Sequence, residues 1–440
     1  MRKKAAFFLI LAVIFLSRFI LVIAGQDLMG DDGFQYLTRA ENYLKYGILS
    51  PDRADSFRNQ FIDSPLYPIL LSCFLRVLNS KIAAVRSICM LNSVFFILAA
   101  CAVFFLAYRL SKKYLVALFS LAVFGMMPEG FVYSILNMPD SMFLAFFIWS
   151  NYFFVSYFGC NRWRRLALAS FLLGMSVLIK PISLLFILVY VVLIISFDKN
   201  DFRRRVKIAV LCILVQMFTL SPWLIRNYHV YKEIFFSTKK DIHLYYYDYR
   251  FILEDIYGKE AAGSMIEQKA REIFSNIDVN SRDSVKAIHV LGGFAKKEIF
   301  SNFSSYATLL IKRHPRLYFG TGTVQLLTLT GDASGAQALY EFGRQPALSM
   351  LRRLPVYVMT LQLFSWILLF LIYLLSIAGL MRIIVKRKWE TLVLLSLSFL
   401  YFVILVGPAT HTRYRFDFSY LFAILCGFVL YEIKSSSENI

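Results

Sequence analysis

Cysteine, acidic residues and the motifs of soluble nucleotide and metal enzymes are scarce or missing in this chain. Only six cysteines occur among 440 residues, with no CxxC pair and none between residues 223 and 354. Neither a disulfide framework nor a zinc site is therefore indicated. No Walker loop, GxSxG, HExxH or Rossmann fingerprint is present, which excludes soluble nucleotide donors bound through those motifs.

Apolar residues dominate what is present. They make up 58% of the chain, and the mean hydropathy of +0.60 is that of an integral membrane protein. The net charge of +20 does not form a nucleic-acid face, because the basic clusters lie between apolar runs and so act as topology signals. These clusters are Arg2-Lys3-Lys4, Arg109 with Lys112-Lys113, Arg162 with Arg164-Arg165, Arg203-Arg204-Arg205 and Lys386-Arg387-Lys388.

The apolar runs predict an all-α, polytopic helical bundle of about ten transmembrane helices, within a range of nine to twelve. The basic N-terminus is expected in the cytoplasm, and this orientation places every basic cluster there. The first run contains Arg18 and is long for a signal peptide, so it is interpreted as a retained anchor. The predicted spans are 5–24, 84–108, 114–136, 138–158, 166–179, 181–197, 206–222, 356–381, 391–407 and 416–432.

Two segments depart from this regular pattern. Residues 166–197 are too long for one span and too short for two full ones, and Lys180-Pro181 divides them because proline breaks the helical hydrogen-bond ladder. Lys180 either lines a polar cavity or extends to the outer interface. The apolar but short segment Pro65–Asn79 is expected to lie along that interface.

Three domains follow from this topology. Residues 1–222 form an N-terminal transmembrane module that includes a first outer loop, 25–83. Residues 223–355 form a long non-cytoplasmic loop with helices packed on the bundle, in which no self-sufficient soluble domain is expected. Residues 356–440 supply the C-terminal transmembrane helices.

The acidic pair Asp31-Asp32 follows the first span at its predicted outer end. A carboxylate at the outer mouth of a membrane bundle is a candidate catalytic base. Alternatively, one carboxylate caps the helix predicted over residues 34–46, which Gly47 would end. Both interpretations can hold, because a cap uses one carboxylate and two are present.

Further charged residues are expected at the same outer face. Asp140 begins a predicted span, where it is either a site residue or an N-cap. Arg413 and Arg415 are expected in a short outer loop, where positive-inside statistics disfavour cations. An anionic ligand such as phosphate would explain their presence. Lipid headgroups or Asp417 are the alternative partners. The cations expected at the outer face are Arg58, Lys180, Arg226, Arg413 and Arg415.

A second set of residues could bind a metal ion, although a lone histidine near an interface is more often structural. The candidate ligands are Asp63, His229, His243 and His411.

Short motifs in order along the chain resemble those of the GT-C membrane glycosyltransferases, in particular the branch of protein O-mannosyltransferases and lipid A aminoarabinose transferases. The sequence departs from that branch at Gly33, where its motif has a second acidic residue, and at Ser64, where aminoarabinose transferases have lysine. The matching motifs are Asp32 to Tyr36 (DGFQY), Ser64 to Pro68 (SPLYP), Asn137 to Asp140 (NMPD), Lys180-Pro181, Pro222 to Asn227 (PWLIRN) and Arg413 to Arg415 (RYR).

The resemblance implies an inverting glycosyltransferase of a prokaryotic inner membrane, with its site on the periplasmic or extracellular side. A polyprenyl-phosphate sugar would be the donor, and a glycan, lipid or protein the acceptor. Asp32, with Asp31 and Asp140, would carry the catalysis. Arg413, Arg226, Lys180, Arg415 and Arg58 would bind the donor phosphate, aided by a divalent ion at Asp63, His229 or His243 if one is used.

Two geometric expectations accompany these roles. Asp140 should face the same cavity as Asp32. Arg413 should point into that cavity, with Arg415 at its rim or paired with Asp417, because residues two apart on a helix point in different directions. A transporter or flippase for lipid-linked saccharides is the alternative function, and an accessory scaffold with an inactive site is a third.

Overall fold

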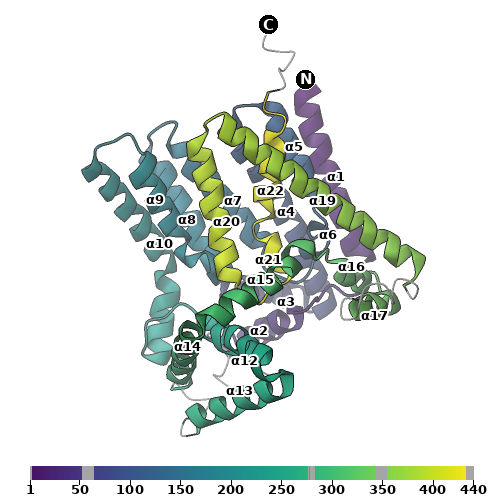
Figure 1. The fold of residues 1–440 in the computed structure, drawn as a ribbon, viewed down its shortest axis with the longest axis vertical. Coiled ribbons are helices and arrows are strands. Elements are labelled where there is room, and N and C mark those ends of the chain that lie inside the picture. The colour runs from purple at the N-terminus through teal and green to yellow at the C-terminus, as the bar shows by residue number, and fades with distance from the viewer. Residues whose placement is uncertain (1, 52–63, 276, 278–282, 343–353, 433–440) are drawn as a thin grey trace.

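The computed structural model describes residues 2–51, 64–275, 277, 283–342 and 354–432, and every regular element in these ranges is a helix (Figure 1). The prediction of an all-α membrane bundle is confirmed. Five helices are long and apolar enough to cross a membrane: α1 (Arg2–Ala24), α4 (Lys81–Ser111), α10 (Phe202–Tyr231), α19 (Val356–Val385) and α20 (Trp389–Val406).

Shorter helices complete the bundle. They are α2 (Gly33–Tyr46), α3 (Leu66–Leu78), α5 (Tyr114–Met126), α6 (Gly130–Tyr133), α7 (Asp140–Tyr157), α8 (Trp163–Ile179), the 3₁₀ helix η1 (Pro181–Phe186), α9 (Ile187–Phe197), α21 (Thr412–Phe416) and α22 (Ser419–Phe428). The predicted break at Lys180-Pro181 is confirmed, because α8 ends at Ile179 and η1 starts at Pro181.

Several predicted boundaries were wrong. The predicted span 114–136 ends as a helix at Met126, since Pro128 follows and the chain turns through α6. Helix α10 passes through Pro222 and continues to Tyr231, beyond the predicted end of this span at residue 222. Proline is tolerated in membrane helices where neighbouring groups satisfy the freed backbone carbonyl.

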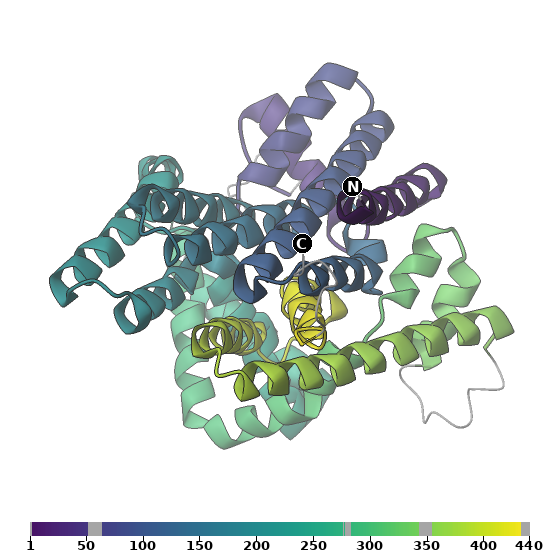
Figure 2. The ribbon, with the colours of Figure 1, turned by 90° about the horizontal axis from the view of Figure 1, so that it is seen from above.

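The C-terminal helix α22 lies at the centre of the bundle. It packs against α5 on one side and α19 on the other, and Figure 2 shows it in yellow among the surrounding helices. In the largest buried cluster, Phe402 contacts Phe147 edge to face and stacks on Phe418, which ties α7, α20 and the start of α22 together. In the same cluster Phe96 of α4 stacks on Phe416 of α21. This rigid core fixes the helix ends that carry the charged residues.

A second group of helices lies beyond the end of the bundle that carries α2 and α3 (Figure 1). It has a core of its own, built around Tyr245, Ile252, Ile266, Leu291 and Ala295. Its elements are α11 (Lys239–His243), the π-helix η2 (Leu244–Tyr249), α12 (Arg250–Tyr257), α13 (Lys259–Phe274), α14 (Ser284–Ser301) and α15 (Phe303–Phe319). The next helices, α16 (Thr323–Leu329) and α17 (Ala333–Phe342), lie beside α19, where Leu327 and Leu339 pack with Val358 (Figure 1).

Asp248 is a buried carboxyl group in the π-helix of this second group. Desolvation raises its pKa to about 7, although a hydrogen bond with Tyr306 opposes the shift. His243 lies 3.7 Å away, but burial, followed by the charge of Lys239, lowers the pKa of this imidazole to about 4. His243 is therefore neutral when Asp248 ionises and does not offset its charge.

The variant Asp248→Asn should flatten the dependence of stability on pH. Because the carboxyl pKa is raised from 3.8 to about 7 on folding, the stabilisation is complete below pH 3.8 and is lost as the pH rises through 7. At pH 8 the isosteric amide should regain on the order of 2–4 kcal/mol. Thermal unfolding of the purified protein between pH 5 and 8 measures this, and parallel profiles for the two proteins would contradict it.

Candidate active site

Asp32 occupies the N-cap position of α2, but its carboxylate makes no capping hydrogen bond. It forms an ion pair with Arg413 instead, so the capping interpretation holds for the backbone position and not for the side chain. The side chain of Asp32 is 38% exposed, which leaves it open to a substrate. The predicted end of this helix is also observed, since Gly47 has the left-handed conformation with φ 71°.

Asp140 is the first residue of α7 and is completely buried. Pro139 takes the N-cap position, so the capping interpretation of Asp140 was wrong. Its carboxylate accepts hydrogen bonds from Arg413 Nε at 3.1 Å and from Lys180 Nζ at 2.9 Å. Lys180 also donates to both carboxylate oxygens of Asp417 at 2.7 Å, so it bridges two buried carboxylates at the break between α8 and η1.

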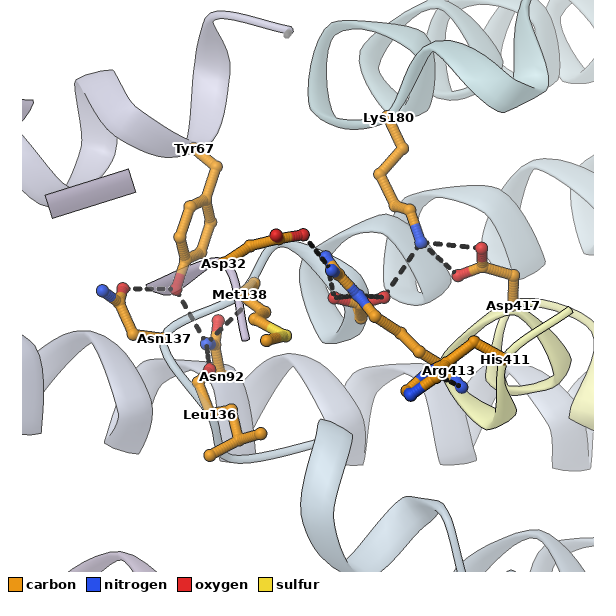
Figure 3. Close-up of polar contacts among 11 residues, drawn as sticks. Asp32, Tyr67, Asn92, Leu136, Asn137, Met138, Lys180, His411, Arg413 and Asp417 are labelled. Carbon is orange, nitrogen blue, oxygen red and sulfur yellow. Dashed lines mark hydrogen bonds and ion pairs between the residues drawn. The ribbon is translucent and has the colours of Figure 1, made fainter. Parts of the chain in front are cut away.

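Arg413 is the centre of this arrangement, because its guanidinium contacts both Asp32 and Asp140. Figure 3 shows the contact between Arg413 and Asp32. The structure thus brings Asp32 and Asp140 together on one cation. His411 caps α21, its Nδ1 accepting the backbone N–H of Arg413 at 3.2 Å. Desolvation lowers the pKa of His411 despite the carboxylates of Asp31, Asp32 and Asp140, and the neutral ring can serve as this acceptor.

A polar network fixes the two loops that carry the carboxylates. Asn137 Nδ2 donates to the carbonyl of Gly33 at 2.9 Å, which ties the loop before α7 to the start of α2. Tyr67 donates its hydroxyl to Asn137 Oδ1 at 3.1 Å and accepts from Asn92 at 3.0 Å (Figure 3). Asn92 also donates to the carbonyl of Leu136 at 2.7 Å.

Sequence reasoning missed Asn92 altogether. The available signal was an amide in the middle of an apolar span, which requires buried hydrogen-bond partners. Gly33 stands where the motif of the resembled family has an acidic residue, and neighbouring atoms leave little space for a side chain at this position. A Cβ there would lie 3.2 Å from Met29 Cβ and 3.4 Å from the carbonyl oxygen of Asn137.

Arg415 does not lie at a rim, and it does not pair with Asp417 as predicted. It is fully buried, and its Nε and Nη2 donate to the two oxygens of Glu129 at 3.0 and 2.6 Å. Its Nη1 donates to the carbonyl of Leu317 and to the hydroxyl of Tyr373. Arg415 thus joins the loop before α6 to α15, and its contacts are structural.

Removing one partner of this buried pair should destabilise the protein strongly. Arg415→Met leaves Glu129 without its charge partner, at a cost of roughly 3–5 kcal/mol. The double variant with Glu129→Leu should recover much of this loss, because no uncompensated charge remains. Thermal unfolding in detergent compares the two, and a single variant as stable as the parent protein would contradict the structural role.

The other predicted site residues have different surroundings or lie outside the described ranges. Arg226 stacks over the rings of Trp223 and Tyr231 and donates to Asn227. Asp31 is exposed beside Asp32. Arg58 and Asp63 lie outside the described residues.

The metal candidates do not form a metal site in the described ranges. Neither His229 nor His243 belongs there to a group of three histidine, cysteine or acidic side chains that could hold an ion. His243 instead stacks on Tyr247 with ring centroids 4.8 Å apart. No reaction step is therefore derived through a divalent ion.

Comparison with known proteins agrees with this architecture. The family of dolichyl-phosphate-mannose-protein mannosyltransferases matches residues 63–225. No curated protein matches the chain.

Among solved structures, the apo oligosaccharyltransferase of Archaeoglobus fulgidus aligns with a TM-score of 0.53 at 13% identity, over 96% of this chain and 50% of that one. The oligosaccharyltransferase AglB from the same organism, in complex with an inhibitory peptide and a dolichol-phosphate, aligns with a TM-score of 0.50 at 13% identity, over 97% of this chain and 50% of that one. ArnT from Cupriavidus metallidurans bound to undecaprenyl phosphate gives 0.42 at 14% identity, over 82% and 76%.

The chain spans about half the length of the oligosaccharyltransferase structures that it matches. The resemblance first seen in short motifs is confirmed: the chain resembles the dolichyl-phosphate-mannose-protein mannosyltransferases over residues 63–225 and has the GT-C fold of the archaeal oligosaccharyltransferase.

Proposed function

We propose that this protein is an inverting glycosyltransferase that moves a sugar from a polyprenyl-phosphate donor to a non-cytoplasmic acceptor. The observation that carries the proposal is the shared cation: Arg413 holds the exposed Asp32 and the buried Asp140 at one end of a membrane bundle. A base beside a phosphate-binding guanidinium is what transfer from a lipid phosphate requires.

The two carboxylates differ in a way that assigns their roles. Asp140 is fully buried and neutralised by Arg413 and Lys180, so it positions cations. Asp32 is the more exposed partner, so it is the one that can reach an acceptor hydroxyl. A donor phosphate that binds Arg413 would compete with Asp32 for the guanidinium and release this carboxylate for catalysis.

The reaction is a single displacement. Asp32 takes the proton of the acceptor hydroxyl, whose oxygen attacks the anomeric carbon from the face opposite the phosphate. The bond from carbon to the phosphate oxygen breaks, and Arg413 and Lys180 stabilise the charge on the leaving polyprenyl phosphate. Inversion at the anomeric carbon follows.

The π-helix η2 is a further candidate part of this site. Burial raises the pKa of Tyr247, and the charges of Tyr414 and Asp32 add to this shift. π-Helical turns often occur at functional sites. The half-exposed Tyr247 ring, stacked on His243, is a suitable surface for a sugar or acceptor.

The orientation belongs to the same proposal. We infer from the basic loops that the N-terminus lies in the cytoplasm and the Asp32 end outside the membrane, and we propose a prokaryotic plasma membrane as its location. The polyprenyl-phosphate donor, the acceptor and the surrounding lipids are then the partners. A divalent ion remains a separate proposal, tested by chelation and by adding back Mg²⁺ or Mn²⁺.

The test uses the purified full chain with polyprenyl-phosphate sugars labelled in the sugar. Transfer of label to an acceptor fraction, with release of polyprenyl phosphate and an inverted anomeric configuration in the product, is expected. A transporter would move the intact lipid-linked saccharide across a vesicle without breaking the sugar–phosphate bond. Intact donor after incubation with envelope glycans, lipids and proteins would contradict the proposed activity.

A further inference from the structure

A second charged site lies at the opposite end of the bundle from Asp32. A cavity of about 630 Å³ opens between the ends of α4, α7 and α9 and the start of α20. Helix α7 runs from Asp140 to Tyr157, and its 18 residues separate the two sites by about 27 Å. The cavity is therefore independent of the proposed active site.

Four cations and one carboxylate line this cavity: Arg109, Lys112, Arg387, Lys388 and Glu390. Within the described part of the chain, none of the four cations forms an ion pair with a carboxylate. The nearby Arg382 and Lys386 differ, since both pair with Glu432. The cavity thus holds an excess of positive charge that these parts of the protein do not neutralise.

The cations repel one another in fixed positions. Desolvation lowers the pKa of Lys112, and the charges of Arg109 and Lys388 lower it further. Lys112 is held as the C-cap of α4 by its backbone N–H, which donates to Tyr108. Lys388 reaches from the next loop to the carbonyl of Leu110 and lies over the ring of Tyr431.

Helix dipoles explain only half of this arrangement. Arg109 and Lys112 stand at the C-terminus of α4, where cations are favoured. Arg387 and Lys388 stand in the short turn between two helices: their backbone N–H groups donate to the carbonyls of Ile384 and Ile383 at the C-terminus of α19, and α20 begins directly after them. The two helix dipoles therefore act on these cations with opposite sign. What indicates a bound anionic group is the gathering of four cations around one cavity without a carboxylate partner in the described ranges.

The remaining walls indicate the source of that group. Phe154, Phe158 and Leu394 present apolar surface to the cavity between membrane helices. A headgroup phosphate with acyl chains matches this combination, whereas a free phosphate would leave the apolar wall uncovered. Basic pockets between helices at the cytoplasmic side favour anionic lipids.

We propose that this cavity binds the headgroup of an anionic phospholipid from the cytoplasmic leaflet, with Arg109, Lys112, Arg387 and Lys388 around its phosphate. The assignment of the leaflet rests on the orientation proposed above, but lipid binding itself does not depend on glycosyl transfer. A failure of lipid binding can therefore be distinguished from a failure of glycosyl transfer.

Native mass spectrometry of the purified full chain, titrated with phosphatidylglycerol or phosphatidylcholine, tests the proposal. Phosphatidylglycerol should bind at least tenfold more tightly. Arg387→Gln with Lys388→Gln should weaken it about twentyfold, because each basic residue contributes roughly fivefold near a membrane surface. Glu390→Gln should strengthen it severalfold, since this exposed carboxylate opposes an anion.

The matched control is Arg203→Gln with Arg204→Gln, which removes the same charge from the exposed first turn of α10, outside the lining of the cavity. It should leave binding within twofold of the parent protein. Equal affinity for the two lipids, an equal loss in the control, or weaker binding in Glu390→Gln would overturn the proposal. Displacement by inorganic phosphate at equal concentration would overturn the lipid as the source.

Discussion

Asp32→Asn should lower turnover roughly 10²–10⁴-fold while leaving folding close to that of the parent protein, as expected for the loss of a general base. Donor affinity should stay the same or rise, because the phosphate no longer competes with a carboxylate for Arg413. The amide keeps the shape of the carboxylate but cannot take the proton of the acceptor. In this variant Arg413 keeps its ion pair with Asp140, which holds the guanidinium in position to bind the donor phosphate. Donor titration and single-turnover transfer separate these two quantities.

Asp31→Asn is the matched control for this variant. It removes the same charge from the neighbouring position, where the side chain is exposed. We expect less than a fivefold change in turnover. If Asp31→Asn lost the activity and Asp32→Asn kept it, the base would be Asp31. If both kept it, Asp140 would become the candidate despite its burial.

Arg413→Lys should impair donor use although it keeps the positive charge. The planar guanidinium contacts Asp32 through one nitrogen and Asp140 through two others, and a lysine ammonium cannot reproduce this fork. Losing one or two charge-assisted hydrogen bonds corresponds to about 10–100-fold weaker donor binding. Turnover should fall as well, because the same guanidinium stabilises the leaving phosphate.

The measurement is donor affinity and turnover at saturating acceptor. Arg271→Lys, on the exposed face of α13, is the control and should behave like the parent protein. Arg226→Ala tests whether the stacked arginine of α10 also reaches the donor. If Arg413→Lys bound and turned over donor normally, the phosphate would be held elsewhere, with Arg58 or a metal ion as the next candidates.

Local signals in the sequence were sufficient for the fold class and for the position of the main break. Long apolar runs predict membrane helices because burial in lipid requires them to be apolar, and Lys180-Pro181 predicts a helix end because proline lacks the N–H. Boundaries within α10 and after α5 were wrong, because packing decides whether a proline ends a membrane helix or lies within it.

The sequence by itself determined that charged residues gather at one end of an apolar helical bundle. Only the tertiary structure decided which of them meet. Arg413 contacts Asp32 and Asp140, which lie 381 and 273 positions away, whereas Arg415 pairs with Glu129, 286 positions away. These two arginines differ because residues two apart on a helix point to nearly opposite sides. One therefore faces the carboxylates of the candidate site and the other the buried interior, and no local pattern specifies the partner on each side.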